Sequence, residues 1–396
     1  MISESSPTYH GWIIVALSFA VITASYSLLY GYAAFLPSLT EDLSISKAEA
    51  IAPYSACIFV YSLASLWSGR LTDRLGARPI VFAGGILVIL GFVVLSRAED
   101  AAMLFLGFTL LYGVGMSGVF IPTSAAIVKW FLVKRGLAVG IANLGGSGAM
   151  AVGPLAAAML ISEFGWRTSF VLLGIVGGGL VSLAALGFRP APSNVSQIDA
   201  GQDTEKAWTL PEARRTSTFW IFCVVYLVTL AVMFFPLAHF AAFAIDLGWG
   251  PNGGGALFLL AAIGGVMGRL GIGWLADRFG AKVGLFGLLA CMAVSCAAFG
   301  VTTDALIIHA SAAVFGVGAG SAVALYPVVV SALFGRAHVG AIAGFAFAFT
   351  CSGGGLGPLI GGWIRDETGS YDGAFLFAAA ASVFALICAM ALRPPK

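Results

Sequence analysis

Residues 264–284 read GGVMGRLGIGWLADRFGAKVG and combine an apolar, glycine-rich helical pattern with a charged turn. Arg269 lies within the apolar part, whereas every other charged residue of the chain can be assigned to a terminus, a loop or a helix end. An ionisable side chain inside a membrane-spanning segment is costly, and such residues commonly belong to functional sites. The stretch therefore predicts a membrane helix that carries a functional cation.

The composition is that of a membrane protein. The 396 residues are 60% hydrophobic and 10% charged, with a mean hydropathy of +0.99. A soluble chain of this size could not bury so much apolar surface, and the apolar runs do not alternate as barrel strands do. Because a spanning helix needs about 20 apolar residues, we predict an all-α membrane protein with twelve transmembrane helices. The predicted spans are 11–37, 48–69, 79–96, 101–128, 136–161, 166–188, 218–245, 253–276, 283–302, 305–334, 339–363 and 373–392.

The basic residues predict the sidedness of the chain. Of the 20 Lys and Arg residues, 15 fall in the even-numbered connections and the C-terminal tail, and four fall in the odd-numbered connections. Short loops rich in Lys and Arg face the cytoplasm. We therefore predict a multi-pass protein of the plasma (inner) membrane with both termini in the cytoplasm.

The two halves of the chain are copies of one another. GRLTDRLGAR at 69–78 recurs as GWLADRFGAK at 273–282, an offset of 204 residues. The same offset carries the Gly-Pro pair 153–154 onto 357–358. Separate sites that share one offset indicate an internal duplication. We predict six-helix bundles at 1–188 and 218–396, joined by a polar cytoplasmic linker at 189–217.

No cofactor or metal is expected. All six cysteines fall in apolar runs without the spacing of metal ligands, so we interpret them as packing residues. The span interiors hold one histidine near mid-membrane and no carboxylate, so they lack the residue groups that metal-dependent or nucleophilic catalysis requires. We predict that the protein is not an enzyme, and the net charge of +2 gives no indication of nucleic-acid binding.

The repeated loop resembles the signature of the major facilitator superfamily, G-x-L-[AT]-D-R-[FL]-G-x-[RK] after spans 2 and 8. The resemblance covers the whole chain. It implies two six-helix bundles related by a pseudo-twofold axis along the membrane normal. The substrate site would then lie between the bundles near the midplane, with alternating access by rocking.

The signature loops also predict a conformational latch. Asp73 and Asp277 can accept hydrogen bonds from arginines or from a helix N-terminus. By resemblance, these aspartates and the adjacent Arg74 and Arg278 would steady the outward-facing state. The alternative is a solvated turn that carries only positive-inside residues.

Three further stretches resemble one branch of the superfamily, the monocarboxylate and oxalate–formate transporters, including bacterial homologues. They are YHGWIIV at 9–15, KWFLVKRGLAVGIANLGGSG at 129–148 and PLAHFAAFAIDLG at 236–248. In that branch an arginine of span 8 anchors the carboxylate of the substrate. The resemblance assigns this role to Arg269.

The chemistry of Arg269 supports the same role. It precedes Asp277 by eight residues, or ~12 Å along a helix, so it lies somewhat cytoplasmic of the midplane. Its planar guanidinium keeps its charge and matches a carboxylate in two-point geometry. No Asp or Glu lies in a span interior, which indicates that the anion arrives as substrate. Two alternatives are that Arg269 snorkels to the cytoplasm or binds backbone carbonyls.

His239 is the second candidate, because imidazole can donate to a carboxylate and can carry a proton. A packed, satisfied histidine is the alternative. By resemblance, aromatic residues of spans 10 and 11 close over the carboxylate, which favours Tyr326 and Phe349. The other predicted substrate-site residues, each with helix packing as the alternative, are Cys351, Ser352, Asn143, Ser117, Leu28 and Tyr30.

The expected substrate is a small monocarboxylate of the lactate or pyruvate type. Oxalate transporters of the branch carry a lysine in span 11, and the span 339–363 has no Lys or Arg. Animal members carry an Asp one turn before the arginine, where this chain has Gly265. We predict a monomeric, proton-coupled symporter whose proton travels on His239 or with the substrate. The alternatives are an organic-anion exchanger and a facilitator for another solute such as an aromatic acid.

Overall fold

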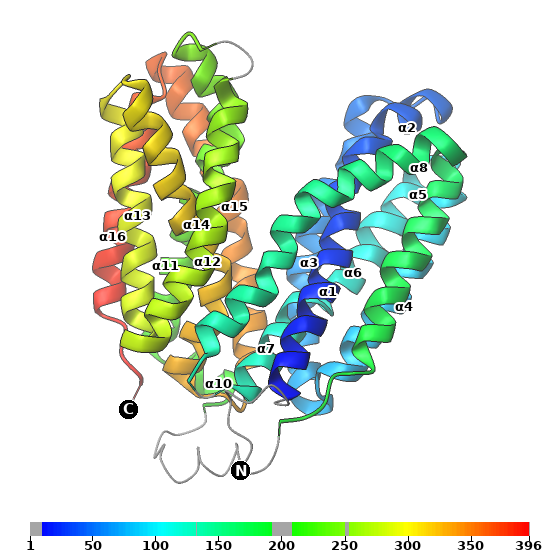
Figure 1. The fold of residues 1–396 in the computed structure, drawn as a ribbon, viewed down its shortest axis with the longest axis horizontal. Coiled ribbons are helices and arrows are strands. Elements are labelled where there is room, and N and C mark those ends of the chain that lie inside the picture. The colour runs from blue at the N-terminus through cyan, green and yellow to red at the C-terminus, as the bar shows by residue number, and fades with distance from the viewer. Residues whose placement is uncertain (1–9, 132, 192–207, 250–252, 396) are drawn as a thin grey trace. The chain divides into compact units, whose positions relative to one another are not determined.

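The computed structural model describes residues 10–131, 133–191, 208–249 and 253–395, and every regular element within these ranges is helical (Figure 1). The predicted all-α membrane fold is therefore confirmed. The helices of the first half are α1 (His10–Gly31), η1 (Tyr32–Phe35), α2 (Leu36–Asp42), α3 (Lys47–Leu75), α4 (Ala77–Ser96), α5 (Ala101–Leu104), η2 (Phe105–Tyr112), α6 (Gly113–Ser117), α7 (Phe120–Trp130) and α8 (Arg135–Ala185). Those of the second half are α10 (Leu210–Ala213), α11 (Ser217–Asp246), α12 (Gly253–Phe279), α13 (Ala281–Val301), α14 (Ala305–Phe334), α15 (Val339–Thr368) and α16 (Asp372–Met390).

In the described part of the chain, 11 helical segments are long and apolar enough to cross a membrane. One of them, α8, has 51 residues and contains Gly165 in a non-helical conformation (φ 72°, ψ 164°). A straight helix of that length would extend ~76 Å, more than twice the ~30 Å hydrocarbon core. Glycine tolerates the positive φ that reverses the chain here. α8 therefore comprises two spans, which agrees with the twelve that hydropathy predicts.

The described helices form two compact units. The first takes its residues from Met1–Leu132, Ile141–Glu205 and Ala337–Ala348, and the second from Val133–Gly140, Lys206–Arg336 and Phe349–Lys396. Each unit thus includes the first turns of one helix, α8 or α15, from the other half of the sequence. Part of the predicted linker (192–207) and the start of the 9–15 motif lie outside the described residues.

The interior of the first unit is rich in aromatic rings. Phe108 and Tyr112 of η2 stack with centroids 4.8 Å apart, and Tyr112 Oη donates a hydrogen bond to the Ser25 carbonyl at 2.7 Å. The polar end of this buried ring is therefore satisfied. Glycines let η2 approach α4, because a Cβ built on Gly91 would lie 2.6 Å from the Gly107 carbonyl oxygen.

Glycines also determine how α12 and α14 pack in the second unit. A Cβ built on Gly268 would lie 2.7 Å from Val317 Cα, and one built on Gly316 would lie 2.8 Å from Ala261 Cα. Lipid is as apolar as a leucine-rich interface, so helices in membranes associate through close packing of small residues. This interface fixes the position of the helix that carries Arg269.

The duplicated Gly-Pro pairs occupy equivalent places in the two units. A Cβ built on Gly153 would lie 2.8 Å from Ser27 Cα, and one built on Gly357 would lie 2.8 Å from Ala231 Cα. Ser27 and Ala231 are themselves separated by 204 residues. The internal duplication therefore extends from the sequence to the helix contacts.

We expect Gly357→Ala and Gly153→Ala to destabilise the fold by roughly 1–3 kcal/mol each, because a methyl group would press against backbone atoms of the neighbouring helix. The measurement is the apparent Tm of the purified protein in detergent. Gly355→Ala is the matched control, since nothing lies within 4 Å of a Cβ at that position of the same helix. Equal Tm values for the Gly355 and Gly357 variants would contradict the packing argument.

Candidate functional site

Arg269 lies half-buried on α12, and its side chain reaches back along the helix. Its Nη1 atom is 4.0 Å from the position that a Cβ on Gly265 would occupy. Side chains on a helix tilt toward its N-terminus, so residues four apart share one face. The absence of a side chain at Gly265 leaves room for the guanidinium.

The internal duplication shows how unusual this pair of residues is. The offset of 204 relates Arg269 to Ser65 and Gly265 to Tyr61. A Cβ on Gly140 would lie 3.2 Å from the carbonyl carbon of Arg269, and one on Gly344 would lie 3.2 Å from that of Ser65. The two backbones are thus equivalent. In the second half a cation and a glycine replace a small hydroxyl and a ring.

Tyr326 lies on α14, which runs parallel to α12. Ala261 packs against Gly316, and Gly268 packs against Val317. These contacts place Arg269 level with residues 318–324, two to eight residues or about 3–12 Å before Tyr326. Tyr326 is 3% exposed, and its ring centroid lies 4.4 Å from that of Tyr226 on α11.

The other residues predicted on α15 have different surroundings. The ring of Phe349 is 41% exposed and contacts Trp220 of α11, with centroids 5.8 Å apart. Cys351 is half-buried, and the exposed Ser352 donates its hydroxyl to the carbonyl of Phe349 at 2.8 Å. Tyr326 and Phe349 therefore both lie beside the first half of α11.

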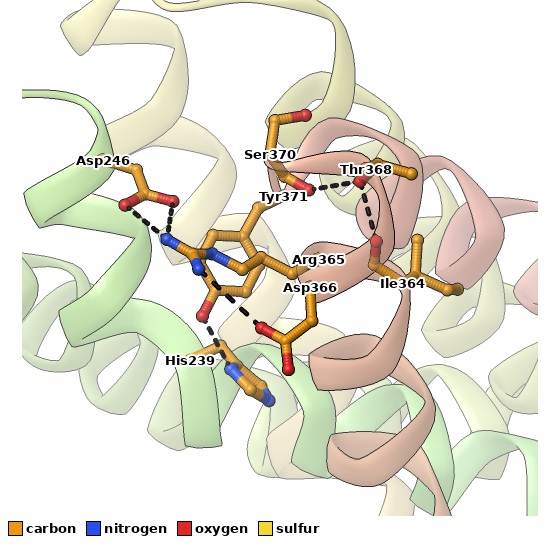
Figure 2. Close-up of polar contacts among 8 residues, drawn as sticks. All are labelled: His239, Asp246, Ile364, Arg365, Asp366, Thr368, Ser370 and Tyr371. Atoms are coloured by element: carbon orange, nitrogen blue, oxygen red, sulfur yellow. Dashed lines mark hydrogen bonds and ion pairs between the residues drawn. The ribbon is translucent and has the colours of Figure 1, made fainter.

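His239 lies on the second half of α11 and is not grouped with these aromatic residues. It follows Tyr226 by 13 residues, or ~20 Å along the helix. Its Nδ1 atom lies 3.0 Å from Tyr371 Oη, and its Nε2 atom lies 3.1 Å from the Pro358 carbonyl oxygen. The imidazole thus bridges α11 to α15 and to the start of α16 (Figure 2).

An ion pair lies on the far side of Tyr371 from the imidazole. Arg365 of α15 donates through Nη2 to both oxygens of Asp246 at 3.4 Å, and its Nη1 lies 3.8 Å from Asp366. Figure 2 shows Arg365 extending across the ring of Tyr371, 5.7 Å from its centroid, toward Asp246. Burial raises the pKa of Tyr371, an effect that the positive charge of Arg365 opposes, so the hydroxyl keeps its proton.

The candidates of the first unit are mainly packed in its interior. Leu28 is 4% exposed and lies against Gly177, where a Cβ would be 2.9 Å from its Cδ1 atom. Ser117 donates to the Val114 carbonyl at 2.7 Å. Asn143 is buried, and Tyr30 is half-buried with its ring 6.1 Å from that of Tyr26.

The two latch aspartates bind helix N-termini. Asp277 accepts hydrogen bonds from the backbone N–H groups of Gly136 at 2.6 Å and Leu137 at 2.9 Å, in the first turn of α8. Residues of this turn belong to the same unit as Asp277. A carboxylate at a helix N-terminus satisfies unpaired N–H groups and complements the helix dipole.

Asp73 repeats this arrangement in the first unit. It accepts from the N–H groups of Gly340 at 3.3 Å and Ala341 at 2.6 Å, each 204 residues beyond its counterpart. Lys129 Nζ adds an ion pair with Asp73 at 2.8 Å. Arg74, which follows Asp73 in the chain, is exposed.

Arg278 is also exposed and lies over the ring of Trp274, 5.5 Å from its centroid. The sequence predicts either arginines or a helix N-terminus as partners of Asp73 and Asp277. The structure shows hydrogen bonds from a helix N-terminus to both aspartates. The sequence pattern does not single out Arg365, Tyr371 or Lys129, because their partners lie far away in the chain.

Comparison with known proteins agrees with this architecture. The family model of the Major Facilitator Superfamily matches residues 15–358 and 240–396. Human monocarboxylate transporter 11 is 33% identical over 387 residues, which cover 92% of this chain and 79% of that protein. Rat monocarboxylate transporter 13 is 29% identical, covering 93% and 86%. The hexuronate transporter of Bacillus subtilis is 25% identical, covering 91% and 89%.

Solved structures with the same fold are more distant in sequence. The fucose–proton symporter of E. coli superposes with a TM-score of 0.72 at 15% identity, covering 96% of this chain and 100% of that one. The human organic anion transporter MFSD10 superposes with a TM-score of 0.70 at 14% identity, covering 97% and 100%. The chain therefore belongs to the major facilitator superfamily of secondary transporters, which are not enzymes, and within it is related to the monocarboxylate transporters.

Proposed function

We propose that the protein transports small monocarboxylates of the lactate or pyruvate type together with a proton, by alternating access. The observation that carries this proposal is the half-buried Arg269, whose guanidinium lies beside Gly265 in the middle of an apolar helix. Relatives named as monocarboxylate transporters support it.

The guanidinium of Arg269 favours an anionic substrate. Moving a charged side chain to the centre of a helix in the membrane costs roughly 2.5–3.5 kcal/mol even on the mildest scale, and arginine does not lower this cost by losing its proton. A substrate carboxylate can bind both of its terminal N–H groups side by side. No second cation occurs in residues 339–363 of α15, which favours a monoanion over a dicarboxylate.

A larger carboxylate is the second candidate. The hexuronate transporter of B. subtilis aligns with most of this chain, and its name indicates a sugar acid. The exposed rings of Trp220 and Phe349 lie beside the same half of α11 as Tyr326 and would also accommodate an aromatic acid. Exchange of one organic anion for another is the alternative to proton coupling.

The proposed orientation places both termini in the cytoplasm and the protein in the plasma (inner) membrane as a monomer. In this orientation, Asp73 and Asp277 lie near the cytoplasmic face. Each binds the first turn of α15 or α8, and we infer that they steady one of the alternating states. The ends of α11 and α15 near Asp246 and Arg365 then face outward.

Uptake into proteoliposomes tests the proposed function. With an inward proton gradient, labelled L-lactate should accumulate above its external concentration, and a proton ionophore should abolish the accumulation. Unlabelled pyruvate, glucuronate, benzoate and oxalate serve as competitors that rank the substrate classes. Uptake of lactate no faster than into protein-free liposomes would contradict the proposal, and uptake without a response to the gradient would contradict proton coupling.

A further inference from the structure

A series of polar groups occupies the Asp246 end of the second unit, within an otherwise aromatic cluster. Asp246 pairs with Arg365, whose guanidinium lies over the ring of Tyr371, and the Tyr371 hydroxyl contacts His239 (Figure 2). The other ring nitrogen of His239 lies beside the carbonyl of Pro358. Three helices contribute to this series. Tyr371 is only 5% exposed, whereas Arg365 and Asp246 are about one-third exposed, so the series leads from solvent to the imidazole.

The two partners of His239 determine how it can carry a proton. The carbonyl of Pro358 can only accept a hydrogen bond, so Nε2 carries hydrogen in either charge state. Tyr371 Oη can both donate and accept. It donates to Nδ1 when the imidazole is neutral and accepts from Nδ1 when the imidazole is protonated. Both states are therefore satisfied by rotation of a single hydroxyl.

Charged groups surround the ring of Tyr371 at the Asp246 end. The ion pair of Asp246 with Arg365 is followed by Asp366, and together these three groups carry a net charge of −1. The exposed Glu367 and Asp372 lie beyond Asp366 and Tyr371 and add negative charge.

The helices that pack against the other sides of α11 carry few titratable groups in their spans. α12 carries Arg269, and α14 carries His309 and Tyr326. His309 stacks on Trp249 with centroids 4.9 Å apart. Within the described residues, the hydrogen bonds of His239 go only to Tyr371 and Pro358.

We propose that His239 is the proton-binding site of the transporter and that Tyr371 relays protons to it from the Asp246 end. This inference rests on the proposed proton coupling and assigns its residues. A proton that reaches Tyr371 Oη through water beside the Arg365–Asp246 pair forms an O–H bond there. The hydroxyl passes its own proton to Nδ1, so tyrosine stays neutral and histidine gains one positive charge. Arg365 and Asp246 are positioning residues that hold the tyrosine ring.

A proton site at His239 is also consistent with the lack of a carboxylate next to Arg269. Gly265 has no carboxylate to offer as a proton acceptor next to Arg269. The proton site is therefore separate from the proposed carboxylate anchor. Binding of both ligands would place the carboxylate at Arg269 and the proton at His239.

Tyr371→Phe tests the relay, because it removes the hydroxyl and retains the ring that packs against Phe375 and Phe243. We expect accumulation of lactate driven by a proton gradient to fall at least tenfold. Exchange of labelled for unlabelled lactate at equal pH should stay within twofold of wild type, since it requires no net proton movement. Tyr32→Phe is the control, because it removes another buried hydroxyl, which donates to the Ala50 carbonyl at 2.9 Å. It should leave both activities close to wild type.

His239→Gln should reproduce the phenotype of Tyr371→Phe, and the double variant should lose no more than either single variant, because both act on one step. Gradient-driven accumulation by Tyr371→Phe at the wild-type level would overturn the relay and leave the proposed function intact. Equal loss of accumulation and exchange would also overturn it, because a purely structural role predicts that result. Wild-type protein that exchanges lactate without responding to the gradient would refute the proton coupling and the relay together.

Discussion

Arg269→Ala is expected to lower Vmax/KM for lactate at least about 100-fold. A hydrogen bond to a charged group contributes roughly 1.5–3 kcal/mol, and each 1.4 kcal/mol corresponds to about tenfold in affinity. Loss of two such hydrogen bonds is therefore sufficient for a 100-fold decrease in Vmax/KM. The measurement is initial uptake in proteoliposomes, with the fraction of monodisperse protein as the control for folding.

Arg269→Lys separates charge from shape. Lysine keeps the positive charge but replaces the planar fork by a single ammonium group. We expect partial activity, with a KM raised about tenfold, because one charged contact survives. Full lactate uptake by the alanine variant would end the assignment of Arg269 as the anchor.

Gly265 provides a matched pair of variants beside the anchor. A Cβ at this position would lie 3.6 Å from Gly316 O and 4.0 Å from Arg269 Nη1, which are ordinary contacts. Gly265→Ala should therefore transport lactate like wild type. Gly265→Asp adds a resident carboxylate that competes with substrate for the guanidinium, so KM should rise wherever this Asp is ionised. An unchanged KM at neutral pH would contradict the proposed position of the substrate.

The second large effect is expected for the latch aspartates. Asp277→Asn replaces a carboxylate that accepts two N–H groups by an amide with one acceptor oxygen. The lost charge-assisted bond is worth roughly 1.5–3 kcal/mol, enough to shift a conformational equilibrium at least tenfold. We expect lactate uptake to fall fivefold or more, while the yield of folded protein stays the same.

Asp73→Asn should have an effect at least as large, because it also leaves Lys129 without the 2.8 Å ion pair. The measurement combines uptake with accessibility of single engineered cysteines at the two ends of the bundle, which reports the population of each state. Arg74→Gln tests whether the adjacent arginine belongs to the latch, as the family resemblance implies. Because this side chain is exposed, we expect uptake close to wild type. Wild-type uptake by both Asn variants would refute the latch.

The fold was largely predictable because hydropathy is a local property. Apolar runs of about 20 residues marked the spans, and the offset of 204 revealed the duplication. Two details depended on backbone conformation. The first predicted span continues through η1 into α2 as far as Asp42, and Gly165 joins two spans within one helical segment, with no separate loop between them.

The candidate site was predictable in part. Arg269 could be proposed as a candidate from sequence because a charge in an apolar run is costly wherever the helix packs. The surroundings of the other candidates could not be predicted in this way. A tyrosine such as Tyr326 or a leucine such as Leu28 is equally compatible with a cavity wall and with a packed interior, and only its neighbours distinguish the two.

The membrane class and the cost of the charge at Arg269 follow from transfer free energies along short segments. The duplicated halves follow from motifs that recur at one offset. Tertiary structure alone decided which groups meet. Tyr371 reaches His239 across 132 residues, and Asp73 reaches Ala341 across 268. Hydrogen bonds act over about 3 Å, so such partners are specified only when helix packing brings distant segments together.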